Sequence, residues 1–139
     1  MERFPLEDLK ESLKEIDKLI VEEKNVRQAA EKIYMIVESC IKILSEFKNL
    51  EEFKIANQHP KKNWSTGLLF SAAKKLSGIS KKDPEKKYKI DESIWDIWEK
   101  AWLLHTLGFH ENLLEIENIE KNAHIAKDII EITKKVLKQ

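Results

Sequence analysis

Two histidines in the second half of the chain are the residues best suited to acid–base chemistry. His105 follows a run of tryptophans and is followed by the segment Gly108-Phe109-His110-Glu111. A neutral imidazole beside a cation can accept a proton near neutral pH, which is the task of a general base in RNA phosphodiester cleavage. Lys100 is the nearest cation that precedes His105. We therefore predict four candidate catalytic residues: Lys100, His105, His110 and Glu111.

This group also has a purely structural interpretation. A histidine on an aromatic helix face is commonly a hydrogen-bonded interior residue. Lys100 lies five residues before His105, and that separation turns two side chains about 140° apart on an ideal α-helix. His105 and His110 do not have the i, i+4 spacing of helical zinc sites, and no thiolate cluster accompanies them. We therefore predict no metal site and no cofactor.

Three tryptophans precede His105 on the same predicted helix. Trp95, Trp98 and Trp102 are spaced by three and four residues, so they line one side of that helix. Large aromatic side chains at this spacing indicate packing in the core or against a second copy of the chain. We assign the three tryptophans as candidate dimer-interface residues.

The centre of the chain is basic although the whole chain has no net charge. Residues 61–89 carry a net charge of +7, whereas residues 1–60 carry −3 and residues 90–139 carry −4. Lysines that neutralise phosphates beside an exposed ring are typical of single-strand nucleic-acid binders, and the alternative is a solvated lysine surface. The candidate nucleic-acid-binding residues are Lys61, Lys62, Trp64, Lys74, Lys75, Lys81, Lys82, Lys86 and Lys87.

The elements that position these residues are predicted to be helices within one domain, residues 1–139. Only three glycines and three prolines occur, which indicates few chain reversals and long helices. Apolar periodicity predicts helices over about 6–20, 26–47, 65–77, 91–107 and 118–136, with a loop over 55–63. The fold class is therefore all-α, an antiparallel up-and-down bundle of four to five helices.

The remaining composition bears on the setting of the protein. One cysteine cannot form an internal disulfide, and no apolar run reaches the roughly 18 to 20 residues of a membrane span. We therefore expect a cytoplasmic protein that does not associate with membranes. The surplus of lysine, glutamate and isoleucine is a bias of proteins from hot environments, and an AT-rich genome would produce much the same composition.

In order along the chain, these features resemble the archaeal PaREP domain family of the HEPN (higher eukaryote and prokaryote nucleotide-binding) helical superfamily. The resemblance covers about residues 6–137. It depends on three runs: Gln28-Ala-Ala-Glu-Lys-Ile-Tyr34, Trp64-Ser-Thr with the leucines that follow, and Trp98 to Trp102 leading into Leu104-His105-Thr-Leu-Gly-Phe-His110-Glu111.

The resemblance implies a homodimeric bundle. Many HEPN proteins look like metal-independent ribonucleases of toxin–antitoxin and defence systems, with an Arg followed after four to six residues by a His. Neither Arg3 nor Arg27 is followed by a His at that distance, and the nearest match is Lys100 with His105. Lysine presents a point charge where that motif uses a planar fork.

Three hypotheses about function therefore stand at this stage. The first is a non-enzymatic homodimer that associates with RNA or with a cognate protein partner, in a toxin–antitoxin or stress setting. The second is a metal-independent ribonuclease with His105 as base and Lys100 stabilising the developing charge. The third is a purely structural dimerisation module.

Overall fold

The computed structural model describes residues 6–61, 63–79 and 93–138, and these residues form helices and connections without any strand. This confirms the all-α prediction. The helices are α1 Leu6–Val21, α2 Val26–Phe47, α3 Glu51–Gln58, α4 Thr66–Lys75, α5 Ile94–Leu103, the π-helix η1 Leu104–His110, α6 Ile116–Asn122 and α7 His124–Leu137.

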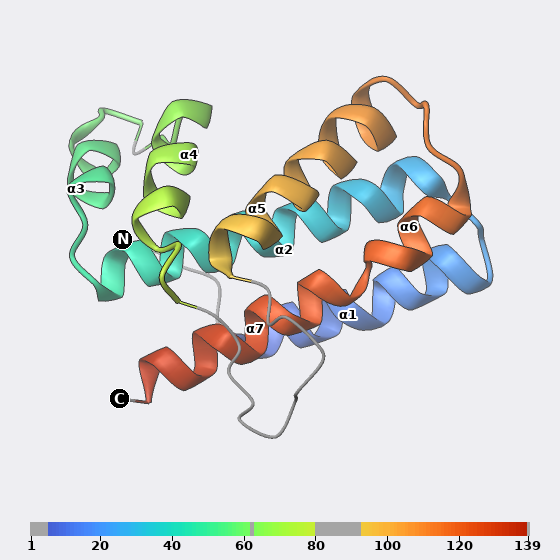
Figure 1. Cartoon of the computed structure of the whole chain (residues 1–139), viewed down its shortest axis with the longest axis horizontal. Coiled ribbons are helices and arrows are strands. Elements are labelled where there is room, and N and C mark those ends of the chain that lie inside the picture. The colour runs from blue at the N-terminus through green and yellow to red at the C-terminus, as the bar shows by residue number, and fades with distance from the viewer. Residues whose placement is uncertain (1–5, 62, 80–92, 139) are drawn as a thin grey trace.

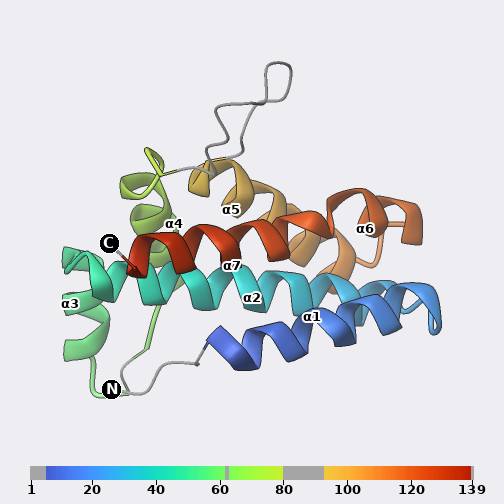
Figure 2. The ribbon, with the colours of Figure 1, turned by 90° about the horizontal axis from the view of Figure 1, so that it is seen from below.

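Helix α2 is the centre of the fold and contacts every other helix of the described chain. Helices α1 and α7 lie along it, α3 and α4 lie at its C-terminal end, and α5 with η1 returns along it toward its N-terminal end (Figures 1 and 2). The apolar stripe of α2 is wide enough to pack against all of these neighbours. Its fully buried side chains include Ile33, Val37, Ile41 and Leu44.

Side-chain caps fix the N-terminal ends of α2 and α5. The Asn25 side chain accepts a hydrogen bond from the Gln28 backbone N–H at the start of α2. At the start of α5, Ser93 and Asp96 form a reciprocal capping box, which satisfies two backbone donors that a helix start otherwise leaves open. The sequence instead places the start of this helix at Asp91, which lies outside the described residues.

The predicted loop over 55–63 is wrong in its first half, because α3 extends to Gln58. His59 is extended, with φ −63° and ψ 139°, as expected for a residue that precedes a proline. Pro60 therefore ends α3 at Gln58, two residues before the proline, and does not prevent the helix from forming. Tertiary contacts fix α3, since the buried Glu52 carboxylate accepts a hydrogen bond from the Ser71 hydroxyl and pairs with Lys75 of α4.

The predicted last helix is present but divided. The chain forms α6 and then α7, with Ala123 between them. Asn118 is the third residue of α6 and its side chain accepts from the Glu115 backbone N–H at 2.8 Å, so the helix begins before the position that the sequence indicates. No helix of the described residues has the length and apolar character that a membrane crossing requires.

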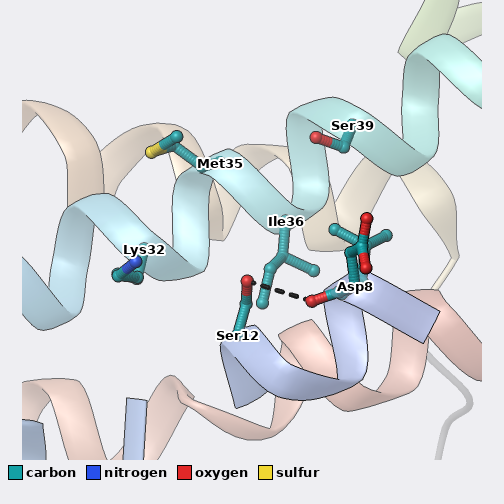
Figure 3. Close-up of a pocket in the computed structure, with 7 residues that line it drawn as sticks. Asp8, Ser12, Lys32, Met35, Ile36 and Ser39 are labelled. Atoms are coloured by element: carbon teal, nitrogen blue, oxygen red, sulfur yellow. Dashed lines mark hydrogen bonds between the residues drawn. The ribbon is translucent and has the colours of Figure 1, made fainter. Parts of the chain in front are cut away.

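A pocket of about 100 Å³ lies between α1 and α2 (Figure 3). Leu9, Met35 and Ile36 give it an apolar lining, and Asp8, Ser12, Lys32 and Ser39 complete it. The Ser12 hydroxyl donates to the Asp8 backbone carbonyl at 3.4 Å. The pocket is small and mainly apolar, so we assign it no chemistry.

Candidate functional site

The π-helix η1 changes which side chains share a face. A π-helix closes its hydrogen bonds over five residues, and the Glu111 N–H donates to the Thr106 carbonyl at 2.9 Å in that manner. Side chains five positions apart, which diverge on an α-helix, can therefore meet on η1. His105 and His110 do so, with 3.0 Å between their Nε2 atoms.

A carboxylate from α2 orients the first of these imidazoles. His105 Nδ1 lies 2.8 Å from Oε1 of Glu31, across 74 positions of sequence. A carboxylate only accepts hydrogen bonds, so the geometry assigns the proton of the neutral His105 ring to Nδ1 and leaves a lone pair on Nε2. The Nε2–H of His110 donates to that lone pair. The three side chains form a continuous chain of hydrogen bonds, which we call the Glu31–His105–His110 chain.

Aromatic rings hold the His105 ring in place. Tyr34 stacks on it with 4.0 Å between ring centroids and 19° between ring planes, and Phe109 lies parallel to it at 5.9 Å. Only 15% of the His105 side chain is exposed, whereas His110 is exposed to solvent. Burial, with the neighbouring Glu38 and Glu31 carboxylates, holds the pKa of the Tyr34 phenol above its ordinary value. Tyr34 therefore remains a neutral packing partner.

Arg27 brings a fixed cation to the same region. Its Nε donates to the Phe109 carbonyl at 2.9 Å, and its guanidinium carbon lies 5.0 Å from the centre of the Phe109 ring. These two contacts anchor the exposed guanidinium of Arg27 beside Phe109, the neighbour of His110 in sequence. The bond to Phe109 uses one of five N–H donors, and the planar fork suits an oxyanion.

Sequence reasoning missed the contribution of α2 to this site. Arg27, Glu31 and Tyr34 are spaced by four and three residues, so they form one stripe along α2. That stripe is the signal available in the sequence. It does not show which later segment the stripe faces.

The structure does not pair Lys100 with His105. Lys100 lines a pocket of about 200 Å³ together with Leu103, Leu104, Leu107, Leu114, Asn118 and Asn122. His105 instead turns toward α2. The separation of five residues between them begins in α5, where this spacing turns the two side chains apart, so the catalytic role of Lys100 stays a prediction. Glu111 is exposed just beyond η1.

The tryptophan stripe lies against the core of its own chain. Trp98 has 0% exposure and its ring packs against Tyr34, Phe70 and Trp102. A side chain without exposed surface cannot contact a partner, so the interface assignment of Trp98 is corrected. Trp95 and Trp102 are half-buried and pack edge-on against Phe70.

Helices α3 and α4, the part of the described chain that holds the candidate nucleic-acid-binding lysines, lie at the opposite end of α2 from η1 (Figure 1). Lys61 and Lys74 are exposed, and Trp64 is half-buried against the core. Lys75 pairs with the Glu52 carboxylate at 3.0 Å, so part of its charge is neutralised within the chain. The other predicted nucleic-acid-binding lysines, Lys62, Lys81, Lys82, Lys86 and Lys87, lie outside the described residues. The Glu31–His105–His110 chain and the exposed lysines Lys61 and Lys74 are therefore separate candidate sites.

Gly108 allows η1 to approach α2. A Cβ atom at this buried position would lie 2.9 Å from Cβ of Ala30 and 3.3 Å from Cδ1 of Leu114. We expect Gly108→Ala to lower the free energy of unfolding by about 1 to 3 kcal/mol through overpacking, as measured by urea denaturation.

Gly67→Ala in α4 is the matched control for this substitution. Its added Cβ would meet nothing closer than Ser65 Oγ at 3.9 Å, and alanine favours a helix over glycine. We expect this variant to be as stable as the wild type or more so. Equal losses in the two variants would refute the close packing of η1 on α2.

The geometry defines a class of protein: an all-α protein built around one central helix, with a carboxylate–histidine–histidine chain between that helix and a π-helix. The chain belongs to the archaeal PaREP1/PaREP8 family, which matches residues 5–130. It is also similar to a protein from Sulfolobus solfataricus whose crystal structure is known. The two are 26% identical and superpose with a TM-score of 0.71, over 98% of this chain and 99% of that one. No curated protein matches the sequence.

Proposed function

We propose that this PaREP protein cleaves RNA without a metal ion, with the Glu31–His105–His110 chain as its acid–base centre. One observation carries the proposal: a part-buried imidazole, oriented by a carboxylate, is hydrogen-bonded to a second imidazole that is exposed to solvent. Such a chain can take up a proton at the surface and hold the resulting charge inside. The resemblance to HEPN proteins supports RNA as the substrate.

The first step would be proton removal from a ribose 2′-hydroxyl. The second ring nitrogen of His110, Nδ1, accepts that proton, and the Nε2–H of His110 passes its proton to Nε2 of His105. Glu31, 2.8 Å from the other nitrogen of His105, stabilises the imidazolium that forms. The 2′-oxygen then bonds to phosphorus.

The second step would return the proton. As the bond from phosphorus to the 5′-oxygen breaks, the imidazolium of His105 gives its proton back through His110 to the leaving oxygen. The products are a 2′,3′-cyclic phosphate and a 5′-hydroxyl. Arg27, anchored at Phe109, replaces Lys100 in our proposal as the cation that stabilises negative charge on the phosphate oxygens.

A second candidate function is association with RNA without cleavage. The observation that favours it is the exposure of Lys61, which follows α3, and of Lys74 in α4, because these two helices lie at the end of α2 away from η1. We propose a homodimer in either case, in a toxin–antitoxin or stress setting. The half-buried Trp95 and Trp102, with Leu103 at 54% exposure, are the candidate contact residues. A cognate protein partner would be the remaining alternative.

The experiment is to incubate the purified full chain with an unstructured, end-labelled RNA in the presence of EDTA, and to measure binding and cleavage together. We expect cyclic-phosphate products from the wild type and none from His105→Ala, with the helical content of the variant checked by circular dichroism. Cleavage that persists in His105→Ala would remove the proposal. Binding that weakens as salt rises, without cleavage, would favour the second candidate, and neither activity would favour a structural module.

A further inference from the structure

We infer that His105 and His110 bind one divalent transition-metal ion of the zinc, nickel and copper class between their Nε2 atoms. The two atoms lie 3.0 Å apart. Imidazole nitrogens lie about 2.0 to 2.1 Å from zinc, so two of them at a tetrahedral angle are roughly 3.3 Å apart. To admit the ion the pair would open by a few tenths of an ångström, and the two rings would turn so that both Nε2 lone pairs point at the ion.

Glu31 orients His105 for metal binding through a hydrogen bond to the ring nitrogen that does not face the ion. Metal-ligating histidines characteristically donate their second ring N–H to a carboxylate, which fixes the tautomer and strengthens the ligand. His105 has this arrangement, with Nδ1 2.8 Å from Glu31 Oε1, and its Nε2 lone pair faces His110. His110 would become a ligand by moving its proton from Nε2 to Nδ1 through solvent. The ring stays neutral, so the exchange needs no further proton acceptor.

The protein supplies two ligands and leaves the other positions to water. The described residues contain no group of three or more His, Cys, Asp or Glu side chains that could hold a metal ion. The ion would enter from the side of the exposed His110. Imidazole ligands suit zinc, nickel and copper rather than magnesium or calcium.

The ion would take the place of the proton that the two histidines share. Where the proposed function holds, and this consequence rests on it, zinc or nickel inhibits RNA cleavage because the proton can no longer pass from His110 to His105. The sequence alone argues against a metal site because the two histidines are five residues apart. The π-helical geometry of η1 removes that objection.

The test is isothermal titration calorimetry of the metal-free full chain with zinc and, separately, with nickel. We expect one ion per chain for the wild type and at least tenfold weaker binding for His110→Ala. Glu31→Gln should weaken binding by about tenfold, since it removes the carboxylate behind the ligand. The matched control is His124→Ala. His124 is exposed and its Nδ1 lies 3.0 Å from Asp128 Oδ2, so it tests a histidine–carboxylate pair that has no second histidine bonded to it among the described residues, and its removal should leave the affinity unchanged.

Equal affinity of the wild type and His110→Ala would overturn the inference, and so would a loss in His124→Ala as large as that in His110→Ala. The calorimetry needs no RNA, so it is independent of the proposed function. Metal binding without cleavage in EDTA would refute the proposed function and keep the metal site. Cleavage in EDTA without metal binding would do the reverse.

Discussion

The His110→Ala variant is expected to cleave RNA at least about 100-fold more slowly than the wild type. His110 is the exposed member of the Glu31–His105–His110 chain, so it is the group through which a proton enters and leaves. Positioned acid–base groups typically contribute a factor of roughly 10² to 10⁴ in rate. The loss should appear in kcat, with KM little changed, because the imidazole acts on the reacting atoms rather than on the rest of the RNA.

The measurement is steady-state cleavage of a labelled RNA in EDTA over a range of RNA concentrations, with thermal denaturation to verify the fold. An exposed side chain contributes little to the core, so the midpoint of unfolding should stay within a few degrees of the wild type. His124→Ala, which removes an exposed histidine on α7, should cleave at the wild-type rate. A His110→Ala variant that keeps the wild-type rate would contradict the proton path.

The Trp98→Ala variant is expected to lose about 3 to 5 kcal/mol of unfolding free energy. The indole is fully buried and contacts Tyr34, Phe70 and Trp102, so its removal leaves a cavity where α2, α4 and α5 meet. Small domains are stable by only about 5 to 15 kcal/mol. The substitution would therefore remove a large part of the total, as measured by urea denaturation.

Two further variants separate packing from hydrogen bonding at this position. Trp95→Ala removes a half-buried indole one turn earlier and should cost clearly less. Trp98→Phe retains a ring and removes Nε1, which has no hydrogen-bond partner among the described residues, so its cost should be well below that of alanine. A Trp98→Ala variant as stable as the wild type would show that the packing of this ring does not stabilise the core.

The sequence predicts α1 and α2 closely because apolar residues repeat with the period of an α-helix over several turns. The sequence does not predict α3, because this helix is stabilised by contacts of Glu52 with Ser71 and Lys75 of α4. Such a contact leaves no local pattern. The apolar pattern that predicts one helix over 118–136 also gives no sign of the division at Ala123.

The candidate site was predictable only in part. His105 and His110 stand out by residue type, but their meeting depends on η1, and no periodicity in the sequence distinguishes a π-helix from an α-helix. Glu31 comes from 74 positions away and could be linked to His105 only by knowing how α2 packs. An aromatic stripe such as Trp95, Trp98 and Trp102 has the same spacing whether it faces a core or a partner, so burial alone decides its role.

The contact of α2 with every other described helix has a consequence for how the molecule opens. A peripheral helix can separate and reclose while the rest stays folded, but α2 cannot leave without breaking every interface at once. Its backbone amides should therefore exchange with solvent only when the whole chain unfolds. The Glu31–His105–His110 chain at one end of α2 and helices α3 and α4 at its other end therefore belong to one cooperative unit.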